Sequence, residues 1–198
     1  MGIVSVFSTK GGVGKSLNAL NLAHWLNPAQ LIDSDVGSGL SDLAGLGDRF
    51  KPVLVRTLAQ AKAALKGNGL ILADCGGFDS DVNRYILAMS DVILVPSGVT
   101  PSDQFGLLAT SKVLASISKA TGRDVRGHIV INDVNPRQSD FSVLQDIVEA
   151  TGNLSIIKPV IPHAAAINNA SLKGDAVTSG EIAAKFSALA ANVLTLVP

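Results

Sequence analysis

Short apolar runs alternate with longer segments of mixed polarity along almost the whole chain. The runs are rich in Ile, Val and Leu and lack the apolar/polar alternation of a half-exposed strand, so they predict strands buried on both faces of a parallel sheet. The predicted strands cover residues 2–8, 30–33, 53–55, 70–73, 92–95, 127–132 and 155–158.

Between these runs, apolar residues recur every three or four positions, which is typical of amphipathic helices. The longest helical pattern covers residues 101–121, where Thr100 is expected to cap the helix, with Pro101 in its first position and Asp103 in its first turn. The other predicted helices cover residues 16–26, 58–66, 81–89, 139–150 and 180–196, with a short one between the glycines of residues 37–47. Alternating strands and helices predict an α/β fold with a doubly wound, mostly parallel sheet. Ligands of such sheets bind beyond the carboxyl ends of the strands.

Composition narrows the class of protein. With 198 residues, 47% of them hydrophobic, the chain is long enough for one buried core, and we expect residues 1–198 to form a single domain. The 16 basic residues equal the 16 acidic ones, so binding to DNA or lipid needs a local patch. One cysteine excludes an internal disulfide framework, and no apolar run approaches the roughly 18 to 20 residues of a membrane span, so we expect a cytoplasmic protein.

A glycine-rich segment from Ser8 to Ser16 joins the first predicted strand to the first predicted helix. Such a turn presents backbone N–H groups and the positive end of a helix to a polyphosphate, while a lysine neutralises phosphate charge and a hydroxyl joins the Mg²⁺ shell. Thr9 stands where the general phosphate-loop pattern has glycine, so the segment is a variant. The residues expected to bind ATP here are Gly11, Gly12, Val13, Gly14, Lys15, Ser16 and Leu17.

Acidic residues follow two of the predicted strands. Asp33 and Asp35 come after the second strand, and Asp74 ends the strand of residues 70–73. A carboxylate at such a place can hold Mg²⁺, and another can orient the attacking water in phosphoryl transfer. Taken singly, each of these acids is also explained as a helix cap.

The segment from Lys10 to Ser16, with a second lysine at its front, resembles the deviant Walker A loop of the ParA/MinD family of dimerising ATPases. The resemblance extends to Asp33-Ser34-Asp35 and to Asp74-Cys75-Gly76-Gly77, although the Pro-Gln that follows the second acid in the family is missing here. It implies a P-loop NTPase that uses ATP and Mg²⁺, closest to the small plasmid-partition branch.

The resemblance also implies roles for single residues. Lys10 would reach the phosphates of the other subunit in a nucleotide-sandwich homodimer, and Lys15 would bind those of its own. Asp35 would position the attacking water. Ser16, Asp33 and Asp74 would form the metal site, with Asp33 as a supporting polar group near the metal. Asn132 and Pro162 occupy the places of residues that contact the adenine base, but an Asn after a strand is also a common turn residue. Cys75 is expected to be a small packing residue.

In function, the resemblance implies slow ATP hydrolysis that positions a plasmid, a chromosome locus or a protein cargo. Nonspecific DNA and a centromere-binding or cargo adaptor protein would be the partners, with association to the nucleoid. However, the arginines expected after Val160-Ile161-Pro162 are absent, and residues 180–196 read as a core helix with no membrane anchor. Two alternatives stay open: a metabolic enzyme of the amidating-ligase or metallochaperone kind on the same fold, and an ATP-binding regulatory protein with degenerate hydrolysis.

Overall fold

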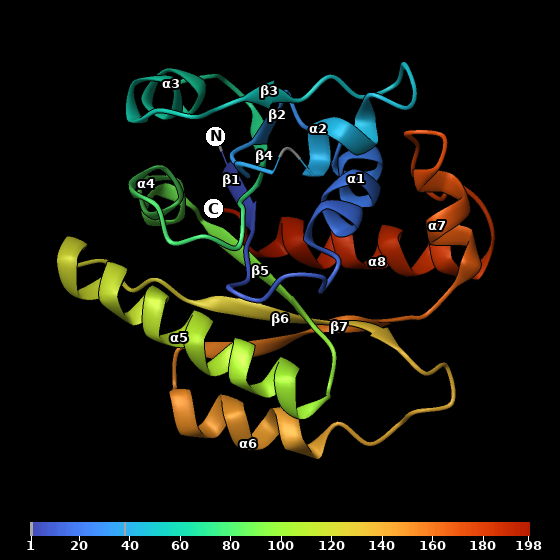
Figure 1. Cartoon of the computed structure of the whole chain (residues 1–198). Coiled ribbons are helices and arrows are strands. Elements are labelled where there is room, and N and C mark those ends of the chain that lie inside the picture. Colours follow the sequence, from blue (N-terminus) through green and yellow to red (C-terminus); the bar gives the residue numbers. More distant parts are fainter. Residues whose placement is uncertain (1, 38) are drawn as a thin grey trace.

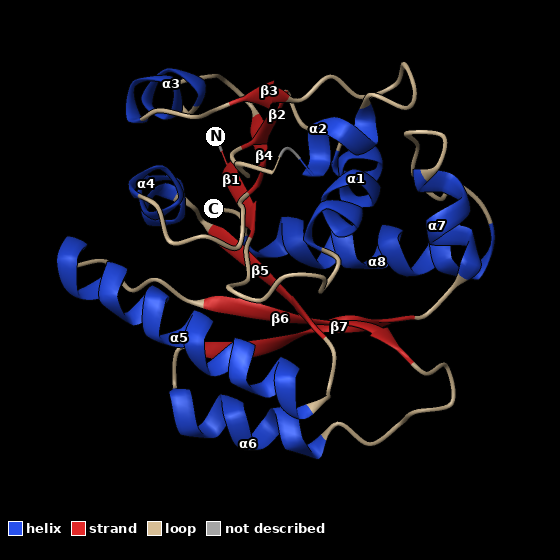
Figure 2. Cartoon of the chain, viewed as in Figure 1, coloured by secondary structure: helices blue, strands red, loops and turns tan. Residues whose placement is uncertain are grey.

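A computed structural model describes residues 2–37 and 39–198 of the chain. Its strands form one sheet in the order β3-β2-β4-β1-β5-β6-β7 (Figure 2). All pairs of neighbouring strands in the described part are parallel, which confirms the predicted α/β class. The strands are β1 (Gly2–Val6), β2 (Gln30–Asp33), β3 (Val53–Leu54), β4 (Leu70–Asp74), β5 (Val92–Ser97), β6 (Gly127–Val134) and β7 (Leu154–Pro162).

Helices cover both faces of this sheet (Figure 1). One face carries α3 (Leu58–Ala64), α4 (Asp81–Met89), α5 (Pro101–Thr121) and α6 (Ser142–Thr151). The other face carries α1 (Lys15–Leu26), α2 (Gly39–Ala44), α7 (Ala165–Ser171) and α8 (Gly180–Leu196).

The hydrophobic core is divided by the sheet into two clusters. Because successive side chains of a strand point to opposite faces, Ile3 and Ile71 join the cluster under α3 to α6, whereas Val4 and Leu72 join the cluster under α1, α2 and α8. Both kinds of position are buried. This explains why the strands read as continuous apolar runs in the sequence.

The C-terminal helix α8 belongs to the core. Phe186, Leu189 and Val193 are buried against the sheet, as expected for residues 180–196. The chain then ends beside β1, where a Cβ atom at Gly2 would lie 2.2 Å from Val197 Cγ1, and Figure 1 shows the two termini close together. No helix in residues 2–37 and 39–198 has the length and apolar character needed to cross a bilayer.

The structure differs from the sequence prediction mainly near the C-terminal edge of the sheet. β7 extends to Pro162 instead of ending at residue 158, with register shifts against β6 around Asn132. The short helix α7 was not predicted, because Ser171 is its one buried residue and its apolar spacing is therefore weak. α3 ends at Ala64 and α6 begins at Ser142, both inside the predicted ranges.

Candidate functional site

The carboxyl ends of β1, β2 and β4 open into one cavity of about 330 Å³. β1 and β4 are neighbours in the sheet, but their connections run in opposite directions: β1 connects to β2 on one side, and β4 connects to β5 on the other. Ligands of such sheets bind at the point where the connections diverge. The cavity brings together residues from three separate segments. Its lining consists of Gly11, Gly12, Gly14, Lys15, Ser16, Leu17, Asp35 and Gly77.

The glycine-rich segment makes the floor of this cavity. Gly14 stands before α1 with a φ of 86°, a conformation that favours glycine, and a Cβ atom there would lie 2.6 Å from Asn132 Nδ2. No side chain caps the N-terminus of α1, and its first turn contains no acid. Lys15 is buried and donates through Nζ to the Lys10 carbonyl at 3.2 Å. Open helix N–H groups beside a lysine favour an anion.

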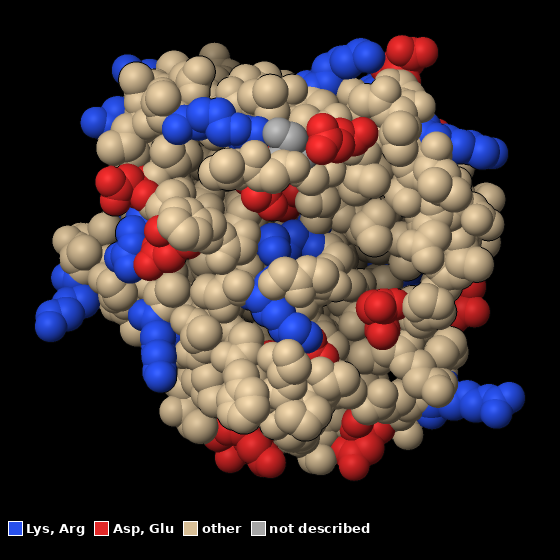
Figure 3. Space-filling model, viewed as in Figure 1, with Lys and Arg blue, Asp and Glu red and all other residues tan. Residues whose placement is uncertain are grey.

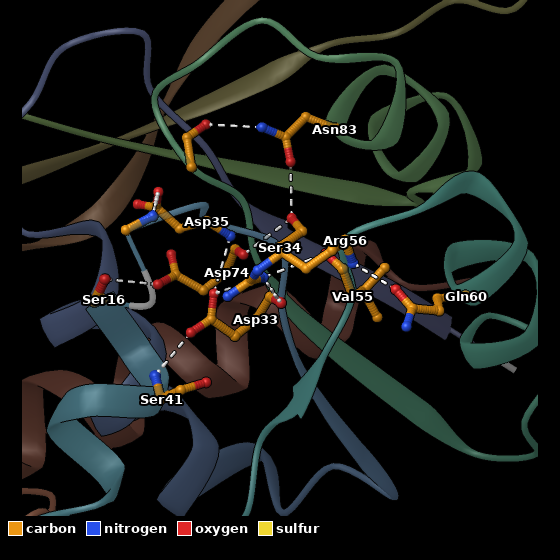
Figure 4. Close-up of polar contacts among 12 residues, drawn as sticks. Ser16, Asp33, Ser34, Asp35, Ser41, Val55, Arg56, Gln60, Asp74 and Asn83 are labelled. Atoms are coloured by element: carbon orange, nitrogen blue, oxygen red, sulfur yellow. Dashed lines mark hydrogen bonds and ion pairs between the residues drawn. The ribbon is translucent and has the colours of Figure 1, made fainter.

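Asp74 is the buried acid behind the cavity. Its Oδ2 accepts a hydrogen bond from Ser16 Oγ at 2.6 Å (Figure 4), whereas its Oδ1 is buried and without a hydrogen-bond partner among the described residues. Burial raises the pKa of Asp74 to about 7; the Ser16 bond opposes this rise and Asp33 adds to it. An unpartnered carboxylate oxygen next to a hydroxyl fits a hard cation such as Mg²⁺.

Asp33 shapes the loop that follows β2. Its Oδ1 accepts from the backbone N–H of Asp35 at 2.9 Å, and its Oδ2 accepts from that of Ser41 at 2.8 Å. Arg56 lies 3.8 Å from the same carboxylate and donates to the Asp33 carbonyl at 2.8 Å (Figure 4). Both carboxylate oxygens are therefore engaged in holding the loop after β2. Sequence reasoning missed Arg56, because nothing local marks it as a partner of β2.

Asp35 lines the same cavity as Lys15. Its side chain is partly exposed, and its Oδ1 accepts from the Gly37 backbone N–H at 3.0 Å. A carboxylate in this place can accept a proton from a water beside the terminal phosphate. The local turn at Gly37 thus orients Asp35 in a chain that has no Pro-Gln after it.

A second cavity of about 110 Å³ adjoins the glycine-rich segment on the side of Val13. Asn132 lines it and donates through Nδ2 to the Val13 carbonyl at 2.9 Å, so this residue also supports the loop. Asn18 lines it too, with a buried Oδ1 that has no partner in the described structure. Sequence reasoning missed Asn18, although a polar residue on the buried face of a helix is a usable signal.

Pro162, expected beside the base, is not among the residues lining this cavity. It borders a different cavity of about 190 Å³ together with Val134 and Phe141. His163 and Ala164, one and two positions later, line the cavity beside Val13 instead. The difference arises because β7 continues through Pro162, so that the chain turns towards the phosphate loop only after the strand ends.

Two structural interpretations from the sequence are confirmed. Burial raises the pKa of Cys75 to about 12, so its thiol stays protonated and the residue acts as packing. Thr100 and Asp103 form a reciprocal capping box at the start of α5. Asp103 has a further contact, because Lys10 Nζ pairs with its Oδ1.

Residues 4–177 match the model of a family described as the CobQ/CobB/MinD/ParA nucleotide binding domain. The chain belongs to this family. The match covers most of the chain, including the glycine-rich segment and all the acids described above. The resemblance stated from the phosphate loop is confirmed, and the chain is an ATPase of the ParA/MinD type.

The following relatives are similar to this chain but distant from it in sequence. Protein ParA of Rhizobium radiobacter is 23% identical in an alignment of 175 positions that covers 80% of this chain and 77% of that protein. McdA of Cyanothece has the same fold, with a TM-score of 0.77 and 17% identity over 98% of this chain and 99% of its own. The MinD cell division protein of Aquifex aeolicus has a TM-score of 0.76 and 16% identity over 98% and 97% of the two chains.

The raised pKa of Asp74 predicts a pH dependence of stability. Its pKa is about 7 in the folded protein and 3.8 ordinarily, so the folded state binds more protons than the unfolded state between these values. Stability from this group is present at low pH and is lost as the pH rises towards 7. Without metal and nucleotide, the free energy of unfolding should fall by about 2 to 3 kcal/mol more in the wild type than in Asp74→Asn between pH 5 and 8.

Urea unfolding at the two pH values measures this difference. Asp74→Asn keeps an oxygen that accepts from Ser16 and removes the titrating group, so the difference between the two pH profiles reports on Asp74. Parallel pH dependence in the two proteins would show that Asp74 has an ordinary pKa.

Proposed function

We propose that residues 1–198 form a single ATPase domain that binds ATP with Mg²⁺, closes into a homodimer around two nucleotides and hydrolyses ATP slowly. The cycle would position a plasmid, a chromosome locus or a protein cargo. The observation that carries this proposal is the shared cavity of Lys15, Ser16 and Asp35, with the unpartnered oxygen of Asp74 behind it and Lys10 at the start of the glycine-rich segment.

Each residue has a role that its surroundings support. Lys15 and the uncapped start of α1 bind the β- and γ-phosphates, and Ser16 and Asp74 hold the metal. The bound Mg²⁺ supplies positive charge beside the phosphates. Asp35, which lines the same cavity, orients the attacking water.

The proposed dimer explains why hydrolysis would be slow in one subunit alone. Lys15 is the single cation among the described residues that line the phosphate cavity. Phosphoryl transfer spreads negative charge over the equatorial oxygens, and a cation supplied in trans accelerates it greatly in other NTPases. Lys10, with a side chain 28% exposed, is suited to supply that charge to a second subunit.

DNA and partner binding belong to the same proposal. On the face drawn in Figure 3, basic side chains are scattered with acidic ones between them, and the net charge is zero. We therefore propose that nonspecific DNA binds across cations that the dimer brings together, which would place the protein on the nucleoid. A centromere-binding or cargo adaptor protein would stimulate hydrolysis.

Light scattering with Lys10→Ala tests the proposal. The wild type should double in mass with ATP and Mg²⁺ but stay monomeric with ADP, whereas Lys10→Ala should stay monomeric with both. The reason is that Lys10 is the residue expected to bind the other subunit's phosphates. Lys112→Ala, which removes an exposed lysine from α5, is the matched control and should dimerise like the wild type.

The same samples separate the alternatives. A wild type that remains monomeric with ATP contradicts the dimer, and rapid turnover only with an added small substrate would indicate a metabolic enzyme. A dimer with negligible turnover would indicate a regulatory ATP-binding protein. Gel retardation of a DNA fragment at rising salt tests the DNA step, since phosphate contacts weaken steeply with salt.

A further inference from the structure

The first residues of the phosphate loop, Thr9 and Lys10, are bonded to α5 of the same chain. Lys10 Nζ pairs with Asp103 Oδ1. Next to it, the Thr9 hydroxyl donates to the Gly106 carbonyl at 3.1 Å, and the Thr9 backbone N–H donates to Thr110 Oγ1 at 3.1 Å. The Thr9 and Thr110 hydroxyls also lie 3.1 Å apart, so four contacts join two adjacent loop residues to the first half of one helix. The loop and this helix lie about 90 to 100 positions apart in the sequence.

Asp103 is suited to hold a lysine firmly. Its side chain is 8% exposed, and its Oδ2 accepts from the Thr100 hydroxyl at 2.6 Å and from the Thr100 backbone N–H at 2.9 Å. Burial alone would raise the pKa of Asp103, but the bonds from Lys10 and Thr100 outweigh this and keep it below its ordinary value. The carboxylate is therefore charged, and Lys10 is its one cationic partner among the described residues.

The aliphatic part of the Lys10 side chain packs against α5 at Gly106. A Cβ atom at Gly106 would lie 2.9 Å from Lys10 Cβ and 3.3 Å from its Cδ, so the absence of a side chain at this position gives room for the lysine stem. The ammonium is thereby directed to Asp103 of its own chain. To contact another subunit, it has to exchange this carboxylate for a different anion.

We propose that Asp103 is a positioning residue that holds Lys10 within its own chain. It thereby sets the nucleotide threshold, the concentration of nucleotide needed for half-maximal dimerisation. This rests on the proposed function, in which Lys10 binds the other subunit's phosphates. A triphosphate carries more negative charge than a diphosphate and competes better with one carboxylate. Asp103 therefore makes the dimer selective for ATP over ADP. The Thr100 bonds persist when Lys10 leaves, so α5 keeps its cap during the exchange.

Asp103→Asn tests this role, because asparagine retains an oxygen for the Thr100 bonds and removes the charge that holds Lys10. We expect the ATP concentration at half-maximal dimerisation to fall about tenfold to a hundredfold, as for loss of one hydrogen bond to a charged group. ADP should now yield a measurable dimer. Asp103→Glu retains the charge and should restore the preference for ATP. Light scattering over a titration of each nucleotide gives both values.

Two further variants separate positioning from a structural or general electrostatic effect. Thr100→Ala removes the side-chain cap but keeps the acid and its bond from the residue-100 backbone N–H, so it should lower the melting temperature and shift the ATP threshold far less than Asp103→Asn does. In the double variant Lys10→Ala/Asp103→Asn, the gain should disappear, because there is no lysine to release. A gain that persists in the double variant would show that Asp103 acts by repelling phosphate directly, and would overturn the proposal.

The possible failures are distinguishable. A wild type that does not dimerise with ATP overturns the proposed function and this inference with it. A wild type that dimerises through Lys10, while Asp103→Asn has the same or a higher ATP threshold, overturns the inference alone.

Discussion

Replacing Lys15 by alanine is expected to lower ATP hydrolysis by about 10²- to 10³-fold, the usual cost of removing one preorganised charge from a transition state. Lys15 is buried at the floor of the phosphate cavity, where the surrounding protein excludes much of the water that would otherwise screen it. The described lining of that cavity contains no second cation to substitute for it. Steady-state release of phosphate measures the effect.

The Lys15→Ala variant also needs a test of its fold, because Nζ donates to the Lys10 carbonyl within the loop. Thermal unfolding without nucleotide should differ little from that of the wild type, since a single hydrogen bond contributes only about 1 kcal/mol. Lys51→Ala removes an exposed lysine and serves as the charge-matched control. Hydrolysis by Lys15→Ala within a few-fold of the wild-type rate would exclude Lys15 from phosphate binding.

Asp35→Ala should separate ATP binding from ATP hydrolysis. We expect the rate constant for hydrolysis to fall about 100-fold, because a positioned carboxylate that accepts a proton from water usually contributes at least this much. ATP binding should persist, since Lys15, Ser16 and the start of α1 remain in place. The variant should therefore accumulate as an ATP-bound dimer whose light scattering does not decay while the wild-type signal does.

Asp42→Ala is the control for Asp35→Ala, because Asp42 is an exposed acid of the following helix, α2. It should hydrolyse ATP and dissociate like the wild type. Unaltered hydrolysis in Asp35→Ala would remove Asp35 from its assigned role. A variant that neither dimerises nor binds ATP would instead show that Asp35 supports the loop at Gly37.

Much of the fold is readable from the sequence because its causes are local. Strands buried on both faces appear as unbroken apolar runs. The start of α5 is marked within four residues by Pro101 in its first turn and by the capping box of Thr100 and Asp103, which bonds the free backbone N–H groups there. The phosphate loop is equally local. Its glycines, Lys15 and Ser16 are adjacent in the chain, so a short motif predicts both the turn and the chemistry that it presents.

The tertiary structure alone decided the contacts between distant segments. It directs Lys10 to Asp103, supports Asp33 with Arg56, and connects Asn132 to the loop through Val13. The order of the strands and the paths of the crossovers bring these residues together, and no single segment of the sequence predicts either of them. For the same reason β7 carries Pro162 past the expected base pocket. The sequence by itself determined which chemical groups this protein has at its phosphate loop, whereas the packing of α5 against that loop decided where Lys10 rests.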